Sequence, residues 1–260
     1  MTRPRPLRYV AIGDSLSEGV GDDPWPNGAL RGWTDRLAQL LQDDTAIRGG
    51  AVEYANLAVR GYKAAQVREG QLANAIAMSP DLVTLTAGMN DILRPRIDFD
   101  VLRSNLVDLV TPFIAHGARV VIVPIPDIRG ISPAGRLINS RRLRLNSIYR
   151  DLEHFHGVLP LTDTTGSVFE DSRAWAEDRL HLSPLGHERL AYAAAASFGM
   201  SANVDWISPP DGLPPRRTVR SEFTWWRRHV APWIGRRLRG KSSGDCRTAK
   251  RSTLERFTLA

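Results

Sequence analysis

Strand-length apolar runs alternate with helix-length segments along most of this chain, and this alternation constrains the fold more than any other feature. The predicted strands are Leu7–Ile12, Val52–Leu57, Asp81–Thr86, Arg119–Val123 and Gly157–Leu161. The predicted helices are Trp33–Leu41, Tyr62–Met78, Phe99–His116, one within Ile131–Phe155, and Pro184–Phe198. Strands separated by helices can pair in parallel, with helices on both faces of the sheet. The sequence therefore predicts a three-layer α/β/α domain with a central parallel sheet of about five strands.

The composition is that of a globular protein. With 260 residues, of which 42% are hydrophobic, the chain can bury a substantial core, and no apolar run approaches the length of about 20 residues that crosses a bilayer. The N-terminal residues lack the apolar core of a secretion signal, and Cys246 is the only cysteine. We therefore expect a cytoplasmic protein without an internal disulfide.

The formal charge of +7 is concentrated at the C-terminal end. Residues 212–260 contain eleven arginines and two lysines against three acidic residues, a net charge of +10, which leaves −3 on residues 1–211. We predict a folded domain over residues 1–202, a proline-rich linker or strap over 203–221, and a basic tail over 222–260. The last twenty residues, from Lys241, are expected to be disordered.

The basic tail carries apolar residues near helical spacing: Phe223, Trp226, Val230, Trp233 and Leu238. Arginines lie among them, and Pro232 interrupts the pattern. Such a segment can lie on an anionic membrane surface, which would place the protein at the inner membrane face. Alternatively, the tryptophans pack against the domain while the arginines face water. A nucleic-acid partner is disfavoured because no recognition motif accompanies the charge.

A serine stands where the first predicted strand ends, in the sequence Gly13-Asp14-Ser15-Leu16. Ligands of open α/β sheets gather at the carboxyl ends of the strands, so this hydroxyl can reach a substrate from a rigid scaffold. Ser15 is thus a candidate nucleophile, although glycine, aspartate and serine also occur together in simple turns.

A serine nucleophile needs a base that is itself oriented by a third group. Of the six histidines, His181 follows Asp178 by three residues, so one loop can turn the carboxylate onto the imidazole. His187 is an alternative base. With Ser183 as the N-cap, however, His187 would lie inside the last helix, where a packing or surface role is expected.

Donors for an oxyanion can come from two further strand ends. Gly61 follows the second strand and could bring a backbone N–H close to a substrate, and Asn90 follows the third strand with a carboxamide N–H. Either residue could instead belong to an ordinary turn or cap. We expect Asp14 and Asp91 to brace the backbone around these groups.

Four blocks occur in order: Gly-Asp-Ser-Leu at 13–16, Asn-x4-Gly at 56–61, Gly-x-Asn-Asp at 88–91 and Asp-x-x-His at 178–181. This set closely resembles the SGNH hydrolase (GDSL esterase/lipase) superfamily over roughly residues 7–200. The resemblance implies a flavodoxin-like sheet and a catalytic triad of Ser15, His181 and Asp178. It also implies an oxyanion hole formed by the backbone N–H groups of Ser15 and Gly61 with the Asn90 side chain. Neither a metal nor an organic cofactor is implied.

The expected function is that of a serine esterase or lipase acting on carboxylic esters through an acyl-enzyme. The substrate would be a small-molecule or lipid ester, with small or short acyl groups favoured. A thioesterase would use the same triad and differ only in the leaving group, and a lysophospholipase with the same triad is a further alternative. A catalytically silent binding module that recruits a partner through the basic tail is the alternative from another class.

Overall fold

The centre of the computed structural model, which describes residues 5–161, 164–200, 204–232, 235 and 243–258, is a five-stranded sheet. The strands are β1 (Leu7–Gly13), β2 (Val52–Asn56), β3 (Leu82–Thr86), β4 (Arg119–Ile122) and β5 (Arg251–Arg256). Their order in the sheet is β4-β3-β1-β2-β5. Neighbouring strands among β1 to β4 pair in parallel, and β5 pairs antiparallel with β2 at the edge of the sheet.

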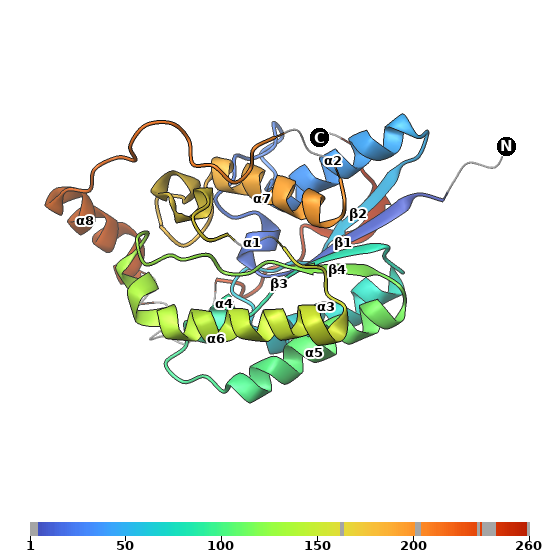
Figure 1. Ribbon diagram of the computed structural model, residues 1–260, viewed down its shortest axis with the longest axis horizontal. Helices are drawn as coiled ribbons and strands as arrows, with labels where there is room; N and C mark the ends of the chain where they lie inside the picture. The colour runs from blue at the N-terminus through green and yellow to red at the C-terminus, as the bar shows by residue number, and fades with distance from the viewer. Residues whose placement is uncertain (1–4, 162–163, 201–203, 233–234, 236–242, 259–260) are drawn as a thin grey trace.

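Helices cover both faces of this sheet (Figure 1). They are α1 (Ser15–Glu18), α2 (Trp33–Ile47), α3 (Ala64–Ala77), α4 (Met89–Ile92), α5 (Phe99–Ala115), α6 (Pro133–His156), α7 (Pro184–Ser197) and α8 (Val219–Trp225). Short 3₁₀ turns occupy Val168–Glu170 and Ser172–Ala174, and a single π-helical turn, Trp226–Val230, continues α8. In Figure 1, α2 and α7 lie on one side of the sheet and α3, α5 and α6 on the other. The predicted three-layer α/β/α fold is confirmed.

The core consists of two apolar clusters, one on each face of the sheet. Along β1, Val10 and Ile12 belong to one cluster, while Tyr9 and Ala11 belong to the other. All four side chains are completely buried, which is why this strand reads as a continuous apolar run. None of the helices in the described ranges combines the length and the hydropathy that a membrane span requires.

The identity of the fifth strand differs from the sequence prediction. Residues 157–161 contribute only an isolated parallel bridge between Leu159 and Val121. The fifth position is filled instead by β5, from the basic tail, so the sheet is mixed rather than wholly parallel. The prediction of disorder from Lys241 onward is wrong for Arg251–Arg256, which is an ordered strand.

The proline-rich segment preceding α8 is pinned to the domain. Residues 204–218 contain no helix or strand, and the Arg173 guanidinium donates to the carbonyl oxygens of Pro210, Asp211 and Gly212 at 2.7, 2.8 and 3.1 Å. Three such bonds satisfy backbone acceptors that have no regular secondary structure to pair them. The segment is therefore a strap along the surface, and it leads the chain to α8.

Candidate active site

The serine turn is formed by a close approach between neighbouring strands. β1 ends at Gly13, whose φ is 135°, and a Cβ added there would lie 2.2 Å from the carbonyl oxygen of Thr86. Only glycine fits this position without displacing β3. Asp14 then caps α1 by accepting the Leu16 N–H at 3.2 Å. As a result, Ser15 is the first residue of a helix at the carboxyl end of a central strand.

The predicted acid–base pair forms within one loop. The Nδ1 atom of His181 lies 2.6 Å from Oδ2 of Asp178, and Oδ1 of Asp178 accepts the backbone N–H groups of Leu180 and His181, each at 3.0 Å. Burial alone would raise the pKa of Asp178, but the hydrogen bond and charge of His181 outweigh it and lower this pKa to about 2. An ionised carboxylate at Nδ1 assigns the proton to that nitrogen, which leaves Nε2 as the basic atom.

One cleft collects every site residue predicted from the sequence. Ser15, Gly61, Asn90, Asp178 and His181 all line a cavity of about 410 Å³. Within the described ranges, the Ser15 hydroxyl and the His181 ring make no hydrogen bond to each other. Such bonds often tighten only when a substrate is bound. The structure thus places the candidate nucleophile and the candidate base in one cavity, with the His181 ring already oriented by Asp178.

Two of the three expected oxyanion donors are unengaged within the described residues. In the part of the chain that the structure describes, the backbone N–H groups of Ser15 and Gly61 have no hydrogen-bond acceptor. Gly61 has a φ of 80°, a left-handed conformation that favours glycine. The third donor, the Asn90 amide, donates to the carbonyl oxygen of Tyr62 at 3.0 Å and to Oδ2 of Asp14 at 3.2 Å. Asn90 would have to share one of these N–H groups with a substrate.

Buried carboxylates brace the site, as we expected for Asp14 and Asp91. Asp14 also accepts the Thr86 hydroxyl at 3.2 Å, and Asp91 accepts the Ala64 N–H at 3.0 Å, which fixes the start of α3. Burial raises the pKa of both carboxyls, that of Asp14 to about 6. Both carboxylates therefore hold the backbone in place, although removing their charges from water is unfavourable.

A buried ion pair that the sequence did not reveal joins the two backbone donors. Glu18, in α1, accepts the Arg60 backbone N–H at 2.6 Å and binds the Arg60 guanidinium with both carboxylate oxygens. This pair ties the Ser15 turn to the Gly61 turn. Glu18 is 4% exposed, so its pairing is structural rather than a solvated surface contact. No local sequence signal pairs these two charges, because 42 residues separate them.

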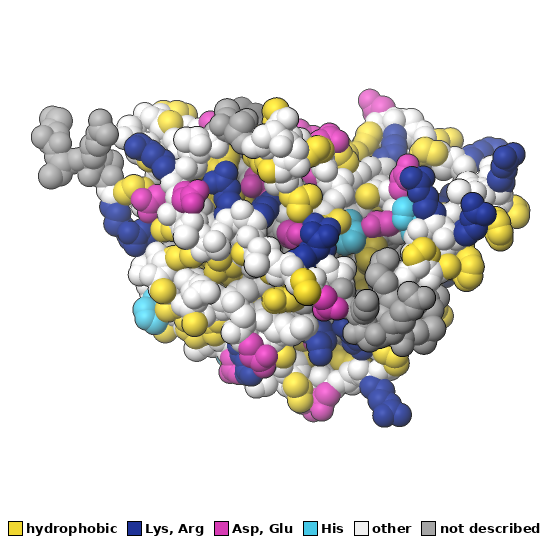
Figure 2. Space-filling view, turned by 180° about the vertical axis from the view of Figure 1, so that it is seen from behind, with side chains coloured by type: hydrophobic (Ala, Val, Ile, Leu, Met, Phe, Trp, Pro, Cys, Tyr) yellow, Lys and Arg dark blue, Asp and Glu magenta, His cyan; other side chains and the backbone are white. Residues whose placement is uncertain are grey.

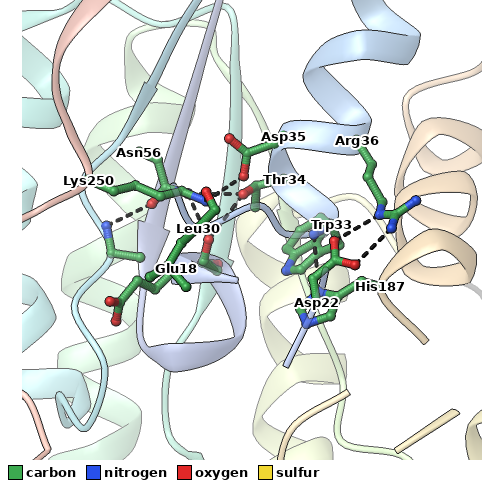
Figure 3. A network of polar contacts seen from close by, with 12 residues as sticks. Glu18, Asp22, Leu30, Trp33, Thr34, Asp35, Arg36, Asn56, His187 and Lys250 are labelled. Carbon is green, nitrogen blue, oxygen red and sulfur yellow. Dashed lines mark hydrogen bonds and ion pairs between the residues drawn. The ribbon is translucent and has the colours of Figure 1, made fainter. Parts of the chain in front are cut away.

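Asn56, the first residue of the Asn-x4-Gly block, positions α1 rather than a substrate. Its amide donates to the carbonyl oxygen of Ser17 at 2.7 Å and to the Thr34 hydroxyl at 2.9 Å (Figure 3). Its Oδ1 accepts the N–H of Ala58 at 3.0 Å. These bonds connect β2 to α1 and to the first turn of α2.

His187 has the structural role that its place in the last helix suggested. It is completely buried, its Nδ1 accepts the Trp33 N–H at 3.1 Å, and Nε2 lies 3.1 Å from the carbonyl oxygen of Val20 (Figure 3). Burial lowers the pKa of His187 to about 4. The neutral ring holds the start of α2 in place and lies outside the residues that line the cleft.

The helix α8 packs against the loop that carries the acid–base pair. Arg179 lies between Asp178 and His181, with an unusual φ of 57°. Its guanidinium binds both carboxylate oxygens of Glu222 in α8, at 2.8 and 2.6 Å, and lies 4.4 Å from the ring centroid of Trp225. Trp225 also lines the cleft, so the tail contributes one wall of the candidate active site.

Beside Ser15 lies a second, narrower cavity of about 90 Å³. Ser15, Asn90 and His181 line both this cavity and the wider cleft. Most of its other lining residues are apolar, among them Met89, Leu93, Val123, Ile125, Phe169 and Trp175. The candidate nucleophile therefore lies at the junction of a small apolar cavity and a larger, more polar cleft.

Comparison with known proteins identifies relatives of this chain. The model of the GDSL-like lipase/acylhydrolase family matches residues 11–189. A curated relative, the uncharacterized protein YpmR of Bacillus subtilis (strain 168), is 32% identical over 108 residues, which cover 40% of this chain and 37% of YpmR. The chain thus spans little more than a third of the length of that relative.

Solved structures share the fold at low identity. TesA is 21% identical, with a TM-score of 0.57 over 74% of this chain and 98% of TesA. Axe2, an acetylxylan esterase from Geobacillus stearothermophilus, is also 21% identical, with a TM-score of 0.58 over 77% and 96% of the two chains. LAE5, an alpha/beta hydrolase enzyme from the metagenome of Lake Arreo, is 20% identical, with a TM-score of 0.61 over 74% and 95%. These structures support the α/β architecture, and the family model covers well over half of the chain and all four sequence blocks. The protein therefore belongs to the GDSL-like lipase/acylhydrolase family.

Proposed function

We propose that this protein hydrolyses carboxylic esters through an acyl-enzyme formed on Ser15. The observation that carries the proposal is the oriented His181–Asp178 pair, 2.6 Å apart, in the cleft that also contains Ser15 and two unengaged backbone N–H donors. A serine hydroxyl requires an oriented base, and the charge that develops in acyl transfer requires donors. Both requirements are supported by residues of this one cleft.

In the first half of the reaction, Nε2 of His181 takes the Ser15 proton as Oγ attacks the ester carbonyl carbon. The backbone N–H groups of Ser15 and Gly61, joined by the Asn90 amide, would stabilise the oxyanion. His181 then protonates the departing alcohol. In the second half, His181 takes a proton from a water molecule as that water attacks the acyl carbon. The bond between the acyl carbon and Oγ of Ser15 then breaks, His181 returns the proton to Oγ, and the acid is released.

The two cavities suggest which part of the substrate lies where. The narrow apolar cavity of about 90 Å³ suits a short acyl group, and the cleft of about 410 Å³ leaves room for a larger alcohol. The acetyl ester named in the description of Axe2 is an ester of the same short-chain kind. We therefore propose short-chain acyl esters as the substrates, with short-chain thioesters, which differ in the leaving group, as the alternative.

The test is hydrolysis of p-nitrophenyl acetate, butyrate and octanoate by the wild type and by Ser15→Ala, with intact-mass detection of a fluorophosphonate adduct. We expect Ser15→Ala to lose turnover by at least roughly 10³-fold and to lose labelling entirely, because no other group replaces the nucleophile. Acetate and butyrate should be turned over faster than octanoate.

Ser104→Ala is the matched control, because Ser104 is an exposed serine on α5, away from the cleft. It should retain full turnover and labelling. A wild type that is folded but neither labels nor turns over any ester would contradict the proposal and favour a binding module. Octanoate as the best substrate would contradict the short-chain assignment alone.

A further inference from the structure

The two sides of α8 face different surroundings. Glu222 and Trp225, three residues apart, face the domain and bind Arg179. Val219, Phe223 and Trp226 recur at the four- and three-residue spacing of one helix face, and they are 89%, 65% and 51% exposed. Trp226 is the first residue of the π-helical turn that continues α8. We call these three side chains the outer stripe of α8. Exposed aromatic side chains gathered on one face mark an interaction surface.

Positive charge accompanies the outer stripe. Residues 216–230 contain five arginines and one glutamate, and that glutamate is bound to Arg179. Arg220 and Arg227 lie three residues before and four residues after Phe223, so both flank the outer stripe. Figure 2 shows dark blue and yellow side chains gathered together at the end of the molecule where α8 lies.

The same segment borders the opening of the candidate active site. Trp225, Arg228 and His229 line the cleft that contains Ser15, together with residues of the domain. Figure 1 shows α8 standing at one end of the molecule, beyond the ends of the sheet strands. A flat partner that contacted the outer stripe would therefore lie beside the opening of this cleft. Residues 203–260 lie outside the match to the family model, which ends at residue 189.

We infer that the outer stripe of α8 and its flanking arginines bind an anionic phospholipid surface. Aromatic side chains on one helix face, flanked by arginines, enter the headgroup region while the arginines pair with lipid phosphates. A stable protein partner usually covers about 800 Å² on each side, far more than three side chains on a protruding two-turn helix supply. The charge and the convex shape both favour a lipid surface over a protein.

The test is co-sedimentation of the full-length protein with vesicles of phosphatidylcholine alone and of phosphatidylcholine mixed with phosphatidylglycerol. We expect binding to the mixed vesicles that weakens with added salt and little binding to phosphatidylcholine alone. Replacing the stripe in Phe223→Ser/Trp226→Ser, or reversing charge in Arg220→Glu/Arg227→Glu, should weaken binding at least about tenfold.

Ile47→Ser/Leu137→Ser is the matched control, because both residues are more than 80% exposed but lie on α2 and α6. It should bind like the wild type. Circular dichroism and turnover of soluble p-nitrophenyl acetate should be unchanged in Phe223→Ser/Trp226→Ser, the stripe variant. These two controls would show that the variant is folded and that vesicle binding is independent of the proposed catalysis.

If the wild type does not bind the mixed vesicles, or if the stripe variant binds them equally well, the inference is overturned. Wild-type dimers in sedimentation velocity that disappear in the stripe variant, without vesicle binding, would overturn it in favour of a second copy of the chain.

Discussion

Burial shifts the pKa values of two side chains, Asp14 and His187, in opposite directions. Burial raises the pKa of Asp14 from 3.8 to about 6 and lowers that of His187 from 6.5 to about 4. Between pH 3.8 and about 6, Asp14 binds more protons in the folded state than in the unfolded state. Between about pH 4 and 6.5, His187 binds fewer protons in the folded state than in the unfolded state. Rising pH therefore destabilises the fold through Asp14 and stabilises it through His187. The two effects partly cancel in the wild type, so only a variant can separate them.

Asp14→Asn should expose the contribution of Asp14. Burial disfavours the ionised carboxylate of Asp14 in the folded state. We therefore expect the wild type to lose on the order of 3 kcal/mol of unfolding free energy relative to the variant as the pH rises from about 4 to about 6. Above about pH 7, the difference should be constant. Urea unfolding of both proteins at several pH values measures it, and a difference independent of pH would contradict the raised pKa of Asp14.

The junction between α8 and the loop of Asp178 and His181 couples the tail to the candidate catalytic machinery. Arg179 connects the two, since its backbone lies between the acid–base residues and its guanidinium lies against α8. Only 14% of the Arg179 side chain is exposed, and the bidentate geometry is the kind in which an ion pair contributes measurably. The orientation of this loop thus depends on an element some forty residues further along the chain.

Breaking this ion pair should impair ester turnover without removing the nucleophile. We expect Glu222→Ala to lower kcat/KM by about tenfold, because Arg179 and the neighbouring loop lose their support. The exchange Arg179→Glu/Glu222→Arg should recover most of the loss that Arg179→Glu causes alone. Steady-state kinetics on p-nitrophenyl acetate test this, with Glu69→Ala, an exposed carboxylate on α3, as the control. Additive losses in the exchanged protein would show that the pair does not couple the two segments.

The C-terminal end of the chain is integral to the domain. Lys250 forms an ion pair with Asp35, and the two side chains are 13% and 1% exposed (Figure 3). β5 follows directly, and Phe257 packs edge-on against Tyr54 with ring centroids 5.9 Å apart. Next to Gly61, a Cβ on Gly244 would lie 2.2 Å from the carbonyl oxygen of Arg60. The tail thus contacts the domain at Asp35, at Tyr54 and at Arg60.

Lys250→Met should destabilise the whole molecule. Removing one partner leaves the buried Asp35 carboxylate without its cation, which costs about 3 kcal/mol or more in comparable pairs. Asp35→Asn/Lys250→Met should be more stable than the single variant, because it removes the charge as well. The midpoint of urea unfolding measures both effects. A single variant as stable as the wild type would mean that the pair does not hold β5 to the domain.

The site was predictable from the sequence where its geometry is local. Asp178 and His181 are three residues apart, so one loop suffices to join them. Ser15, Gly61 and Asn90 each follow a parallel strand, and strands of one parallel sheet end at the same edge. Neither inference needed knowledge of how distant segments pack. The Glu18–Arg60 pair, 42 residues apart, was missed because nothing local pairs one charge with another.

The sequence alone determined the first four strands and the five longest helices, the serine turn and the pairing of Asp178 with His181, because each follows from hydrophobic periodicity or from residues a few positions apart. Only the tertiary structure decided the place of the tail. Arg251–Arg256 is mostly polar and largely exposed, because an edge strand buries little of its surface, so its sequence pattern does not predict a strand. Lys250 forms an ion pair with Asp35, 215 residues away in the sequence, and Arg179 forms one with Glu222, 43 residues away. Contacts of such separation depend on the packing of the complete domain, which local propensity does not encode.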